Sequence, residues 1–152
     1  LEARGFTSED FARSHPAGSL GRKLLPRISD IMHAGEQVPS VASGSSVSDA
    51  LIEMTRKGLG LTAVVDVDHR VLGVFTDGDL RRTLDDAEID LRGTTVDAIM
   101  TARAKTITSD KLAVEAARLM EDFKIHALLV VDSAGKLVGA LNIHDLLRAR
   151  VV

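Results

Sequence analysis

The chain contains no cysteine, no tryptophan and no tyrosine, and its 152 residues include only four phenylalanines. Without cysteine, disulfide bonds and thiolate metal sites are excluded, and we expect a reducing, cytoplasmic compartment. So few aromatic rings offer little stacking surface to single-stranded nucleic acid. The net charge is −3 and neither sign of charge forms a long block, so the basic surface that attracts DNA or an anionic membrane is also missing.

Long apolar runs are missing as well. No stretch approaches the roughly 18 residues of a membrane-spanning helix, and the first residues, LEARGFTSEDF, lack the apolar core of a signal peptide. Aliphatic residues, in contrast, are plentiful, and hydrophobic residues make up 45% of the chain, which is enough to bury a core. We therefore expect a protein that folds in water without a membrane partner.

The sequence consists of two copies of one unit. Residues 54–84 align without a gap on residues 120–150, at a constant offset of 66 (120 minus 54). Upstream, the motif ISDIM at 28–32 pairs with VDAIM at 96–100 once a two-residue length difference is allowed. The aligned identities include Met54/Met120, Val64/Val130, Asp66/Asp132, Gly73/Gly139, Asp79/Asp145 and Arg82/Arg148.

Each unit is predicted to run strand, helix, strand, strand, helix, which makes an α+β protein of two βαββα repeats. The first helix of copy one is expected to start at Ser46, with Asp49 completing a capping box, and to stop at Gly58. In copy two, Asp110 is the expected cap. The runs LTAVVD and ALLVVD are typical of buried strands. The first strands are predicted at 38–42 and 105–108 and the last helices at TDGDLRRTL and NIHDLLRAR.

A unit of about 55 residues buries too little surface to be comfortably stable alone, so we expect the two copies to pack face to face around a shared core. A pair of ferredoxin-like units has the same number of helices and strands, and the order of elements alone leaves that alternative open.

The start of the last helix in each unit is the candidate site. A helix start offers unpaired N–H groups to a phosphate, and the hydroxyl of Thr76 can add a hydrogen bond. Asp79, one turn later, could accept from the two hydroxyls of a ribose. The same Thr-x-x-Asp spacing also serves as a capping box for purely structural reasons, so the residues alone leave both readings open.

The residues GLTAVVDVDHRVLGVFTDGDL and IHALLVVDSAGKLVGALNIHDL resemble the CBS domain family. Both have a VVD strand, a glycine in the next strand and an Asp at the last helix start. They depart from the family pattern at Ala63 and Leu129, where it has proline, and at Asn142, where it has threonine. The resemblance implies CBS repeats at 28–90 and 91–152, packed as a pseudo-two-fold pair.

A second resemblance concerns the full-length protein to which such a pair belongs. SHPAGSLGRKLL, followed at once by ISDIM, is similar to the junction between the sugar isomerase (SIS) and CBS domains of D-arabinose 5-phosphate isomerases, which serve KDO and lipopolysaccharide synthesis. The resemblance implies that residues 1–27 are a junction segment from a SIS domain that the chain lacks. His15 matches a histidine of the isomerase site, but we expect no catalysis from this fragment alone.

Together these observations lead to a regulatory hypothesis: a nucleotide binds between the repeats and changes the activity of the SIS domain. CMP-KDO or an adenine nucleotide (AMP or ATP) is the expected ligand, and no cofactor or metal is expected. A ligand-free oligomerisation module is the alternative, and a homo-oligomer is expected in either case. The histidines show no metal-site spacing, and His33 and His69 are interpreted as exposed loop residues. The expected ligand-binding residues are Val41, Gly60, Leu61, Thr62, Thr76, Asp79, Arg81, Ile107, His126, Ala127, Asn142, His144 and Asp145.

Overall fold

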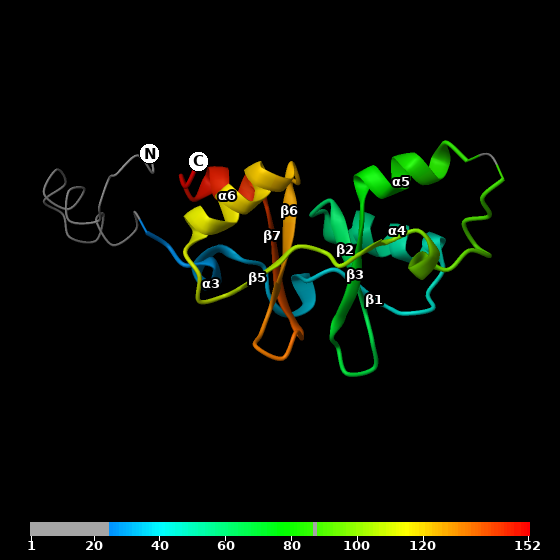
Figure 1. Cartoon of the computed structure of the whole chain (residues 1–152), viewed down its shortest axis with the longest axis horizontal. Coiled ribbons are helices and arrows are strands. Elements are labelled where there is room, and N and C mark those ends of the chain that lie inside the picture. The colour runs from blue at the N-terminus through cyan, green and yellow to red at the C-terminus, as the bar shows by residue number, and fades with distance from the viewer. Residues whose placement is uncertain (1–24, 87) are drawn as a thin grey trace, which may run out of the picture.

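The computed structural model describes residues 25–86 and 88–152, which form two units of the same construction, side by side (Figure 1). Within each unit a small sheet is flanked by two helices, so the predicted α+β fold of two βαββα repeats is confirmed. The first unit comprises β1 (Ser40–Ala42), α4 (Val47–Lys57), β2 (Leu61–Val65), β3 (Val71–Thr76) and α5 (Asp77–Leu84). The second comprises β5 (Thr106–Thr108), α6 (Ala113–Phe123), β6 (Ala127–Val131), β7 (Leu137–Asn142) and α7 (Ile143–Arg148).

The first helix of the unit begins where the sequence predicts it in the first unit but not in the second. Ser46 caps α4 by accepting from the Asp49 N–H at 3.0 Å, and Gly58 ends the helix in the left-handed conformation, as predicted. The predicted capping box is incomplete, because the Asp49 carboxylate does not accept from the Ser46 N–H. The predicted cap at Asp110 is wrong. The helix α6 begins after Leu112, whose N–H donates to a Glu115 carboxylate oxygen at 3.0 Å. Residues 110–112 instead contact residues 27–28: the Arg27 guanidinium donates to the Asp110 carbonyl, the Ile28 N–H donates to the Lys111 carbonyl, and Arg27 and Leu112 form a bridge.

Both sheets have the same strand order. In the first, β1 runs parallel to β2, β2 pairs antiparallel with β3, and a short strand, β4 (Thr101–Ala102), adds to the outer edge of β3. In the second, β5, β6 and β7 repeat this arrangement, and an isolated bridge between His33 and Ala140 occupies the place of β4.

The first segment of each sequence repeat packs against the other repeat. The short helix α3 (Ile28–Ile31) lies on the second unit, where Ile28 is fully buried among core residues of α6, β6 and α7. The 3₁₀ turn η2 (Val96–Ala98) lies on the first unit, where Val96 is buried against α4 and β3. In Figure 1 the blue α3 accordingly lies beside β5 and α6 rather than beside β1. The sequence repeats 28–90 and 91–152 therefore differ from the structural units, because each begins with a segment that packs on the other unit.

The two sheets share a hydrophobic core at the seam between the repeats. Backbone bonds also join the two hairpins, from the Val71 N–H to the Gly135 carbonyl at 3.1 Å and from the Leu137 N–H to the His69 carbonyl at 3.0 Å. The buried core residues at this seam are Leu59, Leu61, Ala63, Val65, Val74, Leu129, Leu137 and Ala140.

Within the described residues no helix is long and apolar enough to span a bilayer.

Candidate functional site

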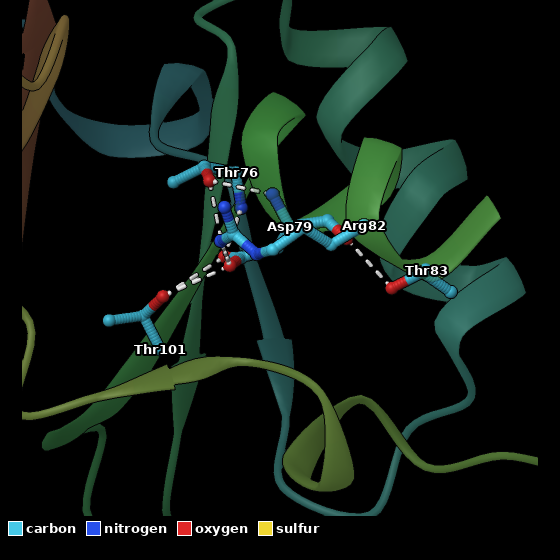
Figure 2. Close-up of polar contacts among 5 residues, drawn as sticks. All are labelled: Thr76, Asp79, Arg82, Thr83 and Thr101. Atoms are coloured by element: carbon cyan, nitrogen blue, oxygen red, sulfur yellow. Dashed lines mark hydrogen bonds and ion pairs between the residues drawn. The ribbon is translucent and has the colours of Figure 1, made fainter. Parts of the chain in front are cut away.

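The start of α5 carries a complete capping box. Thr76 accepts from the Asp79 N–H through its hydroxyl at 3.2 Å, and the Asp79 carboxylate accepts in return from the Thr76 N–H at 3.0 Å. The Thr76 hydroxyl also donates to the same carboxylate oxygen at 3.1 Å. Figure 2 shows these bonds gathered at the top of β3. The predicted pairing of Thr76 with Asp79 is thus present.

Further donors surround the Asp79 carboxylate, which is only 4% exposed. The Thr101 hydroxyl, on β4, lies 3.1 and 3.2 Å from its two oxygens, and the Arg82 guanidinium pairs with Oδ1 (Figure 2). A carboxylate removed from water needs such partners, because burying a charge without them is costly. The Arg82 side chain is 71% exposed, so it is the partner most easily exchanged for a ligand.

The second unit repeats this site with two changes. The Asn142 side-chain oxygen replaces the hydroxyl and accepts from the Asp145 N–H at 3.1 Å, while Asp145 accepts from the Asn142 N–H at 2.8 Å. Arg148 pairs with Oδ1 of Asp145, as Arg82 does with Asp79. In the place of Thr101 stands His33, whose Nε2 lies 2.8 Å from the same oxygen.

The interpretation of His33 as an exposed loop residue is therefore wrong. Its side chain is 27% exposed and lies between the carboxylate of Asp145 and the side-chain amide of Gln37, 3.1 Å from Nδ1. The prediction failed because His33 and Asp145 are 112 residues apart in sequence and meet only through the crossing of α3. His69 does lie exposed in a hairpin turn, with a positive φ of 65°.

The strand starts lie next to the two capping boxes. Leu61 pairs with Thr76 in the register of β2 and β3, and the Gly60 carbonyl accepts from the Asp77 N–H at 3.3 Å. Ala127 pairs with Asn142 in the same way, and the His126 carbonyl accepts from the Ile143 N–H at 2.9 Å. The structure thus brings these predicted residues together with the helix starts. Thr62 is fully buried, and its hydroxyl finds no hydrogen-bond partner among the described residues.

The other predicted residues lie elsewhere. Val41 is half-buried against the first core and Ile107 is buried in the second, both among residues of the helix-covered side of their sheets. Arg81 and His144 are exposed on α5 and α7. His15 lies outside the described residues.

A cavity of about 640 Å³ opens between α6, the start of α7 and residues 151–152. Among the predicted site residues only His126 borders it, and neither Asp79 nor Asp145 lines it. No group of three or more metal-ligating side chains occurs in the part of the chain that the structure describes.

The chemistry common to both sites is a buried carboxylate at a helix start, with an arginine three residues later. A carboxylate of this kind can accept from two neighbouring hydroxyls, and the arginine can pair with an anionic group of the same ligand. Such a pair of functions matches a sugar that carries a phosphate. Sequence reasoning found the carboxylates but missed Thr101 and His33, the partners supplied by the crossing segments.

Comparisons with known proteins agree with this architecture. The CBS domain family matches residues 28–86 and 96–152. The chain is 58% identical over all its 152 residues to arabinose 5-phosphate isomerase KdsD of Pseudomonas aeruginosa, and 49% identical to the Escherichia coli K12 enzyme. It spans 46% of the length of each.

Solved structures of CBS domain pairs share the fold. The CBS domain pair of protein MJ0100, in complex with 5′-methylthioadenosine and S-adenosyl-L-methionine, has a TM-score of 0.73 at 22% identity and covers 82% of this chain and 94% of that one. CBSX2 in complex with AMP has a TM-score of 0.70 at 28% identity and covers 83% of this chain and 96% of that one.

Proposed function

Because the chain belongs to the CBS domain family, as two domains in tandem, we propose that it is the nucleotide-sensing regulatory part of an arabinose 5-phosphate isomerase. The identity of 58% to KdsD, extending over the whole chain, supports this assignment. The interconversion of ribulose 5-phosphate and arabinose 5-phosphate would take place in an attached SIS domain, to which His15 would contribute. The pair itself would not be catalytic, and the enzyme would act in the cytoplasm, in KDO and lipopolysaccharide synthesis.

The observation that carries the proposal is the pair of buried carboxylates, Asp79 and Asp145, each at a helix start and each with an exposed arginine. The ribose hydroxyls of a nucleotide would replace the arginine on the carboxylate, and the freed guanidinium would turn to an anionic group. The AMP complex of CBSX2, which is 28% identical, supports a nucleotide ligand.

CMP-KDO is the ligand that we favour over AMP or ATP. A regulator of this isomerase would usefully report the activated end product of its pathway, and CMP-KDO carries a carboxylate as well as a phosphate. The first site has two adjacent arginines, Arg81 and Arg82, which match two anionic groups, whereas the second has only Arg148 at the equivalent positions. Binding would shift the attached enzyme only through different affinities for two arrangements of the protein, a coupling of about 1–3 kcal/mol.

A ligand-free oligomerisation module is the second candidate, and one observation favours it. Large apolar side chains are exposed on the outer helices, among them Ile52 at 55% on α4, Leu84 at 60% on α5 and Leu147 at 51% on α7. Such positions suit a two-fold contact between copies. This function and nucleotide sensing are compatible, so the deciding measurement is ligand binding.

Thermal unfolding in the presence of AMP, ATP, CMP and CMP-KDO tests the proposal. A ligand at a hundred times its dissociation constant adds about 2.7 kcal/mol to the stability of the folded state. We expect CMP-KDO to raise the unfolding temperature most. If none of the four changes it, the oligomerisation module is the better description.

The variant Asp79→Ala tests the site. Removing the hydrogen bonds that a carboxylate makes to ligand hydroxyls should weaken binding at the first site about 10- to 100-fold in calorimetric titration. Asp85→Ala, an exposed position at the end of the same helix, is the matched control and should leave affinity unchanged. Equal affinity of the Asp79→Ala variant and the wild type would refute the assignment.

A further inference from the structure

The segment that leads into the pair is attached to the second repeat by its backbone. The Pro26 carbonyl accepts from the Ala113 N–H at 2.8 Å, and the Ile28 N–H donates to the Lys111 carbonyl at 2.9 Å. At its other end, His33 and Ala140 exchange two backbone bonds, of 2.8 and 3.1 Å. Residues 26–33 therefore lie on the second repeat from the start of α6 to the middle of β7.

One side chain of this segment reaches the carboxylate of the second site. The Nε2 atom of His33 lies 2.8 Å from Asp145, which is an acceptor only, so Nε2 carries a hydrogen. The Gln37 amide beside Nδ1 can present its oxygen to a protonated nitrogen or its NH₂ to an unprotonated one. The charged groups at this contact are Asp145 and, through it, Arg148. The bond to Asp145 is thus available in both protonation states of the imidazole.

The first site has no such connection. Its crossing residue, Thr101, is preceded by residues 88–100, which follow α5 and connect the first repeat to the second. His33 is instead preceded by residues that continue toward the N-terminus of the chain. The residue at this position is therefore joined to the other repeat of the pair in the first site, and to the segment that precedes the pair in the second.

We propose that His33 is a positioning residue that couples Asp145 to the leading segment: whatever changes the hydrogen bonds of Asp145 changes how firmly residues 28–33 are held on the second repeat. For a nucleotide, this inference rests on the proposed function, because it takes the ligand to bind at Asp145. The second site would then be the one that signals to a domain preceding the pair, whereas occupation of the first would act on the pair itself.

Hydrogen–deuterium exchange of the ligand-free chain tests the coupling without any nucleotide. His33→Ala and Asp145→Asn should each speed exchange of the bonded amides of residues 28–33 about tenfold, and leave residues 96–101 unchanged. Thr101→Ala is the matched control: it should speed exchange of residues 96–101 and leave that of residues 28–33 unchanged. His33→Gln, which keeps a donor, should restore slow exchange at 28–33. Unchanged exchange there in His33→Ala, or no rescue by His33→Gln, would overturn the proposal.

A second arm adds saturating CMP-KDO, and separately AMP, to the wild type and to His33→Ala. A nucleotide that binds should change exchange at residues 28–33 at least about threefold in the wild type, and not in the variant. Binding with no difference between the two proteins would refute the coupling while the proposed function stands. If neither nucleotide binds the wild type, the proposed function fails, and the ligand-free arm still decides the coupling.

Discussion

Two glycines mark where a crossing segment approaches a strand too closely for any side chain. A Cβ on Gly73 would lie 2.6 Å from Sδ of Met100 and 2.8 Å from the Thr101 carbonyl oxygen. A Cβ on Gly139 would lie 2.5 Å from Sδ of Met32 and 3.0 Å from the His33 carbonyl oxygen. The methionines can shift, but the carbonyls belong to backbone that pairs with the same strands. Glycine at these positions is therefore required by packing.

Gly73→Ala and Gly139→Ala should each lower the free energy of unfolding by about 1–3 kcal/mol, because the added methyl group overpacks the contact and displaces the crossing segment. Urea denaturation followed by circular dichroism measures the change. Gly78→Ala, within α5 and with no neighbour closer than 3.6 Å, is the control and should be neutral or slightly stabilising. A Gly139→Ala variant as stable as the wild type would mean that the segment does not approach β7 this closely.

At the scale of elements, the loop between β1 and α4 is tied to η2 by one carboxylate. Asp97 accepts from the Ser43 hydroxyl at 2.5 Å and from the Gly44 N–H at 2.7 Å. The Ser43 hydroxyl, and after it the Gly44 N–H, lower the pKa of Asp97 below its ordinary value. The second unit lacks this tie, since Ser29 stands at the position equivalent to Asp97.

This tie should be sensitive to acid. The folded pKa of Asp97 lies below the unfolded one, so its contribution is complete above about pH 4 and is lost as pH falls through the folded pKa. Ser43→Ala should cost about 1 kcal/mol at pH 6, and the gap to the wild type should narrow toward pH 3. Urea denaturation at both pH values measures it. Ser109→Ala, the equivalent in the second unit, should show no pH-dependent gap.

The sequence predicted the elements of each repeat because the offset of 66 superimposes two amphipathic helices and two strand pairs, whose patterns are local. It could not predict which repeat receives ISDIM and which VDAIM. The two motifs are alike and each can bury its first apolar residue in the core of either repeat, so the pattern fits a direct and a crossed packing equally. The carboxylates of the site could be predicted because each lies only three residues after its helix cap. His33 and Thr101 could not, because they are 112 and 22 residues away from the carboxylates that they contact.

At the scale of the whole molecule, the seam core and the crossing segments make the two repeats dependent on each other. Leu129, on β6, is 1% exposed and packs among seam residues from both sheets. Ile28, which leads into the first repeat, fills the core of the second, and Val96, which leads into the second repeat, fills the core of the first. Unfolding one repeat would therefore expose the seam of the other and release a segment from its core, so neither repeat should have a stability of its own.

We expect Leu129→Ala to lower the free energy of unfolding by about 2–5 kcal/mol, because it leaves a cavity at the shared core. Unfolding should remain a single transition, with amide signals of both repeats lost at one urea concentration. Leu72→Ala, on β3 but 40% exposed, is the control and should cost about 1 kcal/mol or less. Loss of the second repeat's signals at lower urea than the first's would contradict the mutual dependence, since a cavity at a truly shared core destabilises both repeats by the same amount.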